Sequence, residues 1–244
     1  MKTKDRLKTK DRLSDIVLTT LRFTLMAAMP PKLLGRLFQS LSLASAGKDP
    51  EIGRYALDCN NPQALCFLID VFPQLQHYLQ KYQRNSSVSF LDLGPGFGAA
   101  AGLISEMYRS DFLGPKVSVD VMDIVEDRRS FIELNYPNVS FIHSAIENID
   151  PDLMWDLVYC SNALEHHPDP DLFIGSILKH TRGYAFIIAP YNEAHPLSLD
   201  HKHQITEKTF DRFKVESISI FKTAAWPVTA CGVDRYQILS ILKA

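Results

Sequence analysis

The sequence has few cysteines, almost no net charge and no long apolar run. Its 244 residues include 4 cysteines, and no two of them form a C-x-x-C pair. The cysteine spacing therefore indicates neither a zinc site nor a disulfide framework, and reduced thiols fit a cytoplasmic protein. The net charge of −2 gives no general attraction to nucleic acid or membranes. No segment reaches the roughly 20 apolar residues that a membrane span needs.

The N-terminal region is the basic part of the chain. Residues 1–36 contain nine Lys or Arg and three Asp, which leaves a charge of −8 for the rest. A six-residue repeat opens the sequence, and we expect residues 1–13 to be a disordered tail. The apolar stretch Ile16–Met29 contains Arg22, which argues against a secretory signal peptide. Its leucines recur at helical spacing, so the alternatives are a packing helix and a basic amphipathic helix that touches a membrane.

Residues 1–84 are expected to form a helical N-terminal extension. Asn61-Pro62 is a helix start signal, with Asn as the N-cap and Pro at the first helical position. The helix that follows should reach about Val71, and Pro73 should kink it or start a new helix.

Short apolar runs alternate with helical segments from Val88 onward. Strands are expected at residues 88–93, 117–122, 139–143, 155–160, 184–189, 215–221 and 235–242, with helices at 99–108, 128–134, 169–180 and 207–213. This alternation predicts an α/β fold, a Rossmann-like and mostly parallel seven-stranded sheet with helices on both faces. The last two strands have no helix between them and should pair as an antiparallel C-terminal hairpin. Residues 85–244 should therefore form one domain.

A glycine-rich loop follows the first expected strand. Gly94, Gly96 and Gly98 let the backbone turn sharply and approach a ligand closely. Ligands of such sheets bind beyond the carboxyl ends of the strands. The loop also matches G-x-G-x-x-A, the dinucleotide fingerprint, so the glycines alone do not choose between nucleotide cofactors.

The surroundings of the loop favour S-adenosylmethionine over NAD or FAD. Asp92 lies two residues before the first glycine, where its carboxylate could receive the methionine ammonium but would be repelled by a pyrophosphate. No Lys or Arg lies in or beside the loop to favour a phosphate. The second strand ends at Asp123, a candidate for the ribose hydroxyls that suits both kinds of cofactor.

Several motifs, in order, resemble those of the class I S-adenosylmethionine-dependent methyltransferases. Val88–Gly98 resembles the first strand and loop of the family, and Val119–Ile124 the second strand with its terminal acid. Trp155–Pro170 resembles the stretch F-D-L-V-x-x-x-x-V-L-E-H-x-x-D-P, and Ala189–Asn192 the exit of the fifth strand. His201–Phe213 is similar to a stretch in the branch that includes quinone-pathway and other small-molecule methyltransferases. The resemblance covers residues 85–244.

The resemblance implies S-adenosyl-L-methionine as cofactor and S-adenosyl-L-homocysteine as product. Asp123 would hold the ribose, Ile124 would pack against adenine, and Ser144 stands where the family often has an adenine-binding Asp. The cofactor-binding residues implied are Asp92, Gly94, Pro95, Gly96, Gly98, Asp123, Ile124, Ser144, Ala145, Ser161 and Asn162.

Methyl transfer is a direct displacement that mainly needs alignment and exclusion of water, with a base only for acceptors that keep a proton. His166, His201 and His203 are the candidate catalytic residues, against the alternative of loop histidines held by structural hydrogen bonds. The H-x-H pair, together with nearby His195, Asp200 and Glu193, is chemically adequate for a metal. Its spacing is irregular and the resemblance requires no metal, so we expect none. The simplest interpretation is a loop that closes over the pocket.

The sequence thus predicts methyl transfer to a small molecule, with oxygen acceptors slightly preferred. A lipid-like quinone, a glycan intermediate or another natural product could be the acceptor, and the helical extension would select it. The alternatives are an NAD(P)-dependent oxidoreductase and a non-catalytic module that binds the cofactor. No basic, aromatic-rich patch indicates a nucleic-acid partner.

Overall fold

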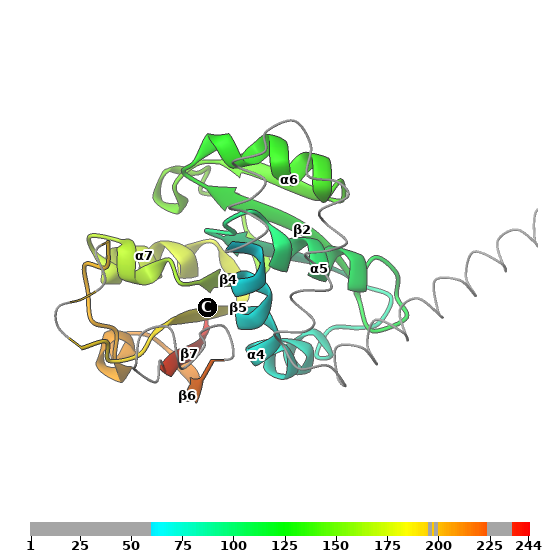
Figure 1. The fold of residues 1–244 in the computed structure, drawn as a ribbon. Helices are drawn as coiled ribbons and strands as arrows, with labels where there is room; N and C mark the ends of the chain where they lie inside the picture. The colour runs from blue at the N-terminus through cyan, green and yellow to red at the C-terminus, as the bar shows by residue number, and fades with distance from the viewer. Residues whose placement is uncertain (1–59, 195–196, 198–199, 224–235) are drawn as a thin grey trace, which may run out of the picture.

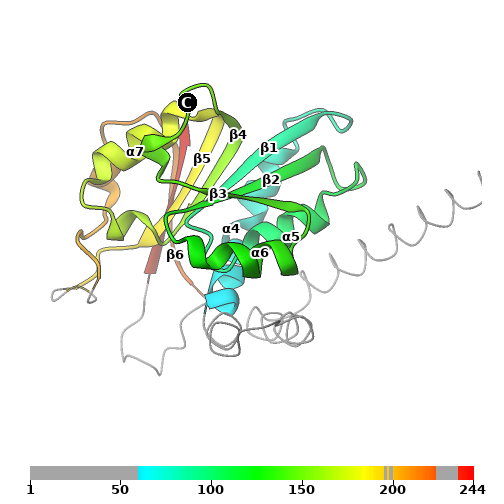
Figure 2. The same cartoon turned by 90° about the horizontal axis from the view of Figure 1, so that it is seen from above.

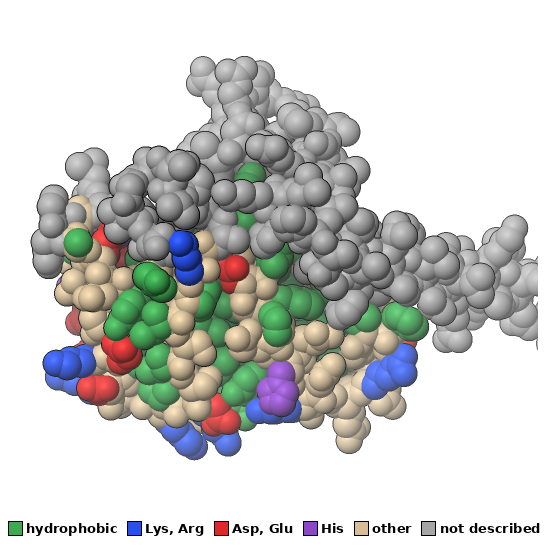
Figure 3. Space-filling model, turned by 60° about the horizontal axis from the view of Figure 1, so that its bottom comes forward, with side chains coloured by type: hydrophobic (Ala, Val, Ile, Leu, Met, Phe, Trp, Pro, Cys, Tyr) green, Lys and Arg blue, Asp and Glu red, His purple; other side chains and the backbone are tan. Residues whose placement is uncertain are grey.

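The computed structural model describes residues 60–194, 197, 200–223 and 236–244. The expectations for residues 1–59, including the disordered tail and the basic amphipathic helix, lie outside the described residues. None of the described helices is long and apolar enough to cross a membrane. On the face drawn in Figure 3, positive and negative side chains are interspersed with hydrophobic ones, in keeping with the small net charge.

A mixed seven-stranded sheet forms the centre of the molecule (Figures 1 and 2), with the order β3-β2-β1-β4-β5-β7-β6. The strands are β1 Ser87–Leu93, β2 Lys116–Asp123, β3 Val139–His143, β4 Trp155–Ser161, β5 Thr181–Pro190, β6 Val215–Lys222 and β7 Tyr236–Lys243. Neighbours among β1 to β5 are parallel, whereas β7 is antiparallel to both β5 and β6. The predicted sheet and its antiparallel C-terminal strand pair are confirmed.

Helices cover both faces of the sheet, as predicted. Figure 2 shows α4, α5 and α6 on one side and α7 on the other. Their bounds are α4 Asn61–Leu79, α5 Ala99–Met107, α6 Arg129–Asn135 and α7 Pro170–Lys179. Each side has its own apolar cluster, one with Leu68 of α4 and Ile104 of α5, the other with Ile174 of α7. The expected helix at 207–213 is instead a four-residue 3-10 turn, Glu207–Phe210, closed by a capping box between Thr206 and Thr209.

The helix α4 differs from its prediction at both ends. It begins with Asn61 as its first helical residue, and Asn60 precedes it without a side-chain cap. The helix continues through Pro73 to Leu79, so the expected end near Val71 is wrong. A proline removes one helical hydrogen bond, but Leu68, Val71 and Leu75 are all 0% exposed. Burial of this apolar face outweighs the local cost of the proline.

Truncation of a buried side chain in α4 tests this packing. We expect Leu68→Ala to lower the free energy of unfolding by about 2–5 kcal/mol, because a fully buried leucine leaves a cavity. Leu172→Ala in α7 is the matched control, since Leu172 is 55% exposed and its loss should cost less than about 0.5 kcal/mol. Denaturant unfolding measures both values. Equal effects of the two substitutions would contradict the packing of α4.

Candidate functional site

The glycine loop leaves the carboxyl end of β1 and leads into α5. Gly94, Gly96 and Gly98 have φ angles of +69°, +59° and +80°, in the left-handed region that side chains with a Cβ rarely adopt. A Cβ on Gly96 would also lie 2.2 Å from Oδ1 of Asn60. At Gly96, both the backbone conformation and the space require a glycine, as the sequence motif predicted.

Asp92, the penultimate residue of β1, is buried and incompletely hydrogen-bonded. The residue is 2% exposed, and its Oδ2 has no hydrogen-bond partner among the described residues. Burial raises the pKa of Asp92 to about 7, opposed by a backbone hydrogen bond from Ala101, with nearby Asp123 raising it further. A buried oxygen without a partner is costly, so this carboxyl is suited to a cationic or hydrogen-bond-donating ligand group.

Asp123, at the end of β2, already has partners. Its carboxylate accepts a hydrogen bond from Val125 N at 2.9 Å and forms an ion pair with Arg128. Arg128 lines the pocket, and its guanidinium lies 5.7 Å from the centre of the Phe97 ring in the glycine loop. No basic residue is adjacent to the loop in the sequence, but in the folded protein Arg128 lies close to it. The sequence argument missed Arg128 because a fold, and not a motif, brings it to the loop.

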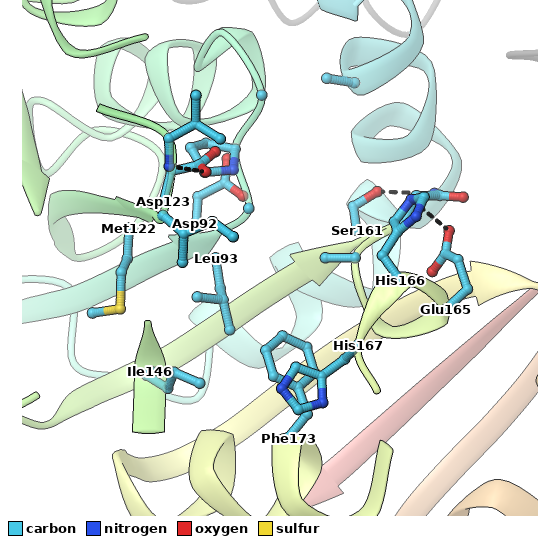
Figure 4. A pocket seen from close by; sticks show the side chains of 18 of the residues that line it. Asp92, Leu93, Met122, Asp123, Ile146, Ser161, Glu165, His166, His167 and Phe173 are labelled. Carbon is cyan, nitrogen blue, oxygen red and sulfur yellow. Dashed lines mark hydrogen bonds and ion pairs between the residues drawn. The ribbon is translucent and has the colours of Figure 1, made fainter. Parts of the chain in front are cut away.

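A cavity of about 940 Å³ joins the carboxyl ends of β1, β2 and β4. Figure 4 shows Asp92 and Asp123 on one side and Glu165 and His166 on the other. We call these the loop side and the histidine side. The lining includes every cofactor-binding residue expected from the sequence except Gly98, namely Asp92, Gly94, Pro95, Gly96, Asp123, Ile124, Ser144, Ala145, Ser161 and Asn162.

For two of these residues, the position of the side chain does not directly match the expected contact with adenine. Ile124 is 70% exposed, so it presents an open apolar surface at the rim of the cavity. The Ser144 hydroxyl donates a hydrogen bond to the Ala145 carbonyl oxygen at 3.0 Å, and is therefore turned toward its own backbone.

Two of the three candidate histidines lie together at the cavity, and the third does not. His166 and His201 line the cavity, with ring centres 4.8 Å apart. His203 is not among the lining residues, and its Nε2 lies 2.9 Å from the Pro168 carbonyl oxygen. The structural-hydrogen-bond alternative therefore describes His203, whereas His166 and His201 are in a position to contact a ligand.

His166 and His201 each have a carboxylate partner. Nδ1 of His166 lies 3.3 Å from Oδ2 of Asp200, and Nδ1 of His201 lies 2.5 Å from Oε2 of Glu193. These partners fix the ring orientations and favour the tautomer with the proton on Nδ1. Either Nε2 would then be able to accept a proton.

Glu165 is a second buried carboxyl, on the histidine side. It is 1% exposed, and neither of its oxygens has a hydrogen-bond partner among the described residues. Burial raises the pKa of Glu165 to about 8, and the negative charges of Glu193 and Asp200 raise it further. No chemical role for Glu165 could be predicted from the sequence, because the sequence does not show that this loop carboxyl is buried.

Glu165, His166 and His201 also form a group of possible metal ligands. Their donor atoms lie within 4.8 Å of one another. Two atoms that are each about 2.1 Å from one zinc ion can be no more than about 4.2 Å apart. The donor atoms are therefore spaced more widely than the ligands of a zinc ion. The expected absence of a metal stays a prediction.

The first turns of α4 supply residues to the cavity that no sequence motif marked. Asn60, Gln63, Ala64 and Phe67 line it. Their spacing places them on one face of the helix, beside the loop of β1. The expectation that the region before residue 85 contacts the acceptor stays a prediction, although α4 lies where such a contact would be made.

Substitution of Glu165 tests the burial of its carboxyl group. Because the folded protein holds the proton of Glu165 to about pH 8, and an unfolded chain only to about pH 4.3, stability from this group falls as pH rises between these values. We expect the melting temperature of Glu165→Gln, relative to the wild type, to increase from pH 5 to pH 9. Glu133→Gln, at a side chain 51% exposed, is the control. A difference that does not change with pH would contradict the burial of the Glu165 carboxyl.

Comparison with known proteins supports the methyltransferase resemblance. Residues 91–188 match the family model described as a methyltransferase domain. A ubiquinone biosynthesis O-methyltransferase from Rickettsia akari is 25% identical over 157 residues, which cover 64% of this chain and 58% of that protein. The chain thus spans less than two thirds of the length of this curated relative.

Two solved structures share the fold at low sequence identity. Magnesium protoporphyrin IX methyltransferase from Synechocystis PCC 6803, solved with bound SAM, is 14% identical with a TM-score of 0.51, over 89% of this chain and 99% of that one. The [4+2]-cyclase SpnF is 12% identical with a TM-score of 0.52, over 70% of this chain and 79% of that one. The same architecture therefore carries different reactions.

The family match, the strand order and the glycine loop at the end of β1 agree with one another. Residues 91–188 match the methyltransferase domain model, and the chain shares its Rossmann-like fold with solved methyltransferase structures.

Proposed function

We propose that the protein transfers a methyl group from S-adenosylmethionine to a small-molecule acceptor, with a hydroxyl oxygen as the preferred acceptor atom. The observation that carries this proposal is the buried Oδ2 of Asp92, which lies in a cavity beside the glycine loop and has no hydrogen-bond partner among the described residues. A methionine ammonium would satisfy that oxygen and stabilise the charged form of the carboxyl.

The loop side of the cavity fits the rest of the cofactor. Gly94 and Gly96 line the cavity with their backbone in a left-handed conformation, and Asp123 stands at the end of β2, where a ribose hydroxyl could replace or share the contact with Arg128. When bound there, S-adenosylmethionine supplies a methyl carbon that its sulfonium already activates. The protein's own task is then to hold the acceptor and exclude water.

The histidine side fits a hydroxyl acceptor. His166 and His201 each have Nδ1 beside a carboxylate, so Nε2 is the atom that would receive a hydroxyl proton. On His166 this atom also lies 4.0 Å from Oε1 of Glu165. Glu165, Glu193 and Asp200 make this side acidic, so it favours a neutral or cationic acceptor over an anionic one. The name of the Rickettsia relative supports an oxygen acceptor. A lipid-like quinone and a glycan intermediate both satisfy these conditions.

Two rival functions remain open to direct test. The G-x-G-x-x-A pattern and the nearby Arg128 favour a dinucleotide cofactor, against which the charge of Asp92 counts. The fold shared with a cyclase allows a module that binds the cofactor without methyl transfer.

Thermal stabilisation by S-adenosylhomocysteine and not by NAD would exclude the oxidoreductase, and the opposite result would exclude our proposal. Incubation with methyl-labelled cofactor and source-cell lysate should then label a small molecule, and labelling of nothing would favour the binding module.

Substitution of Asp92 tests its contact with the cofactor. We expect Asp92→Ala to abolish measurable binding of S-adenosylhomocysteine and Asp92→Asn to weaken it at least tenfold, because both remove the charge that pairs with the ammonium. In the wild type the affinity should increase from pH 6 to pH 8, as the Asp92 carboxyl with its pKa of about 7 ionises. In Asp92→Asn that increase should be absent.

Isothermal titration calorimetry of the full chain measures these affinities. Asp211→Asn, at an exposed position beyond the 3-10 turn, is the matched control and should bind as the wild type does. Unchanged affinity in Asp92→Ala would show that the cofactor lies elsewhere.

A further inference from the structure

The residue that precedes α4 is hydrogen-bonded to the glycine loop. Oδ1 of Asn60 accepts a hydrogen bond from the backbone N–H of Phe97 at 2.9 Å. Phe97 lies between Gly96 and Gly98 and is 6% exposed, so its N–H would have little access to water without this acceptor. The side chain thus joins two segments that are 37 residues apart in the sequence.

The fit between Asn60 and the loop is close. The Asn60 amide occupies the space that a side chain at position 96 would need, since a Cβ there would lie 2.2 Å from Oδ1 and 2.7 Å from Nδ2. Gly96 has a φ of +59°, a conformation that glycine alone adopts without strain. The glycine therefore serves two purposes, the left-handed turn and the close approach of Asn60.

The rest of α4 is anchored firmly enough to position that side chain. Leu68, Val71 and Leu75 are completely buried in the cluster that also contains residues of α5 and β1. Asn60 and Gln63 are at the opposite end of the helix and line the cavity. The helix thus extends from the core of the domain to the glycine loop, although it lies outside the matched residues 91–188.

We propose that Asn60 is a positioning residue that holds the glycine loop in its ligand-binding conformation, so that α4 is part of the cofactor site. The inference rests on the proposed function, namely that the loop binds S-adenosylmethionine. Without the Asn60 acceptor, its hydrogen bond with the Phe97 N–H is lost and the loop samples other conformations. Binding must then select the competent conformation, which lowers the apparent affinity.

Substitution of Asn60 in the full chain tests this role by two readouts. Asn60→Ala should weaken the binding of S-adenosylhomocysteine about tenfold by calorimetry, and should speed the hydrogen exchange of the Phe97 amide in the unliganded protein. Asn60→Asp keeps an acceptor oxygen and should retain the protection of that amide. Gln80→Ala, at the far end of α4, is the control and should change neither readout.

The outcomes separate this inference from the proposed function. Wild-type affinity in Asn60→Ala would contradict the inference, and so would weaker binding with unchanged exchange of the Phe97 amide, which would indicate a direct contact with the ligand. Failure of the wild type to bind S-adenosylhomocysteine would contradict the proposed function instead. The hydrogen-exchange comparison needs no ligand. If Asn60→Ala does not fold, Asn60→Asp is compared with the wild type instead, and loss of protection of its Phe97 amide would contradict the inference.

Discussion

The site depends on one buried carboxyl group at the end of a central strand. β1 lies between β2 and β4, and the chain passes from one side of β1 to the other at this point. Such a reversal of strand order opens a crevice beyond the carboxyl ends of the strands. Asp92 is in that crevice and is 2% exposed, and one of its oxygens has no hydrogen-bond partner in the described part of the chain. The backbone of Gly94 and Gly96 lines the same cavity, in which a ligand group could pair with this carboxyl.

The cavity has a second buried carboxyl on its opposite side, and the two together define its chemistry. Glu165 lies beside His166 and His201, away from the glycine loop. Burial raises the pKa of both Asp92 and Glu165 well above their ordinary values. Such groups lower the stability of the empty protein at neutral pH, because their ionised forms are poorly solvated. Their presence on both sides of one cavity is typical of a site arranged for a ligand.

The sequence predicted the sheet well because buried parallel strands appear as short apolar runs. β3 has its expected bounds, whereas β5 begins three residues early at Thr181, Arg182 and Gly183, which are not apolar. Asp92 and the glycines could be found because their chemistry is local. Asn60, Arg128 and the burial of Glu165 could not, since they depend on contacts between distant segments. His203 resembled a catalytic residue in sequence, yet its ring is directed to the Pro168 carbonyl.

The most direct test of this account is a crystal structure of the full chain with S-adenosylhomocysteine. We predict that its ammonium contacts Asp92, that its ribose lies at Asp123, and that its sulfur faces the side of the cavity with His166 and His201. Ligand bound outside the cavity, or bound inside it with the ammonium remote from Asp92, would contradict the account.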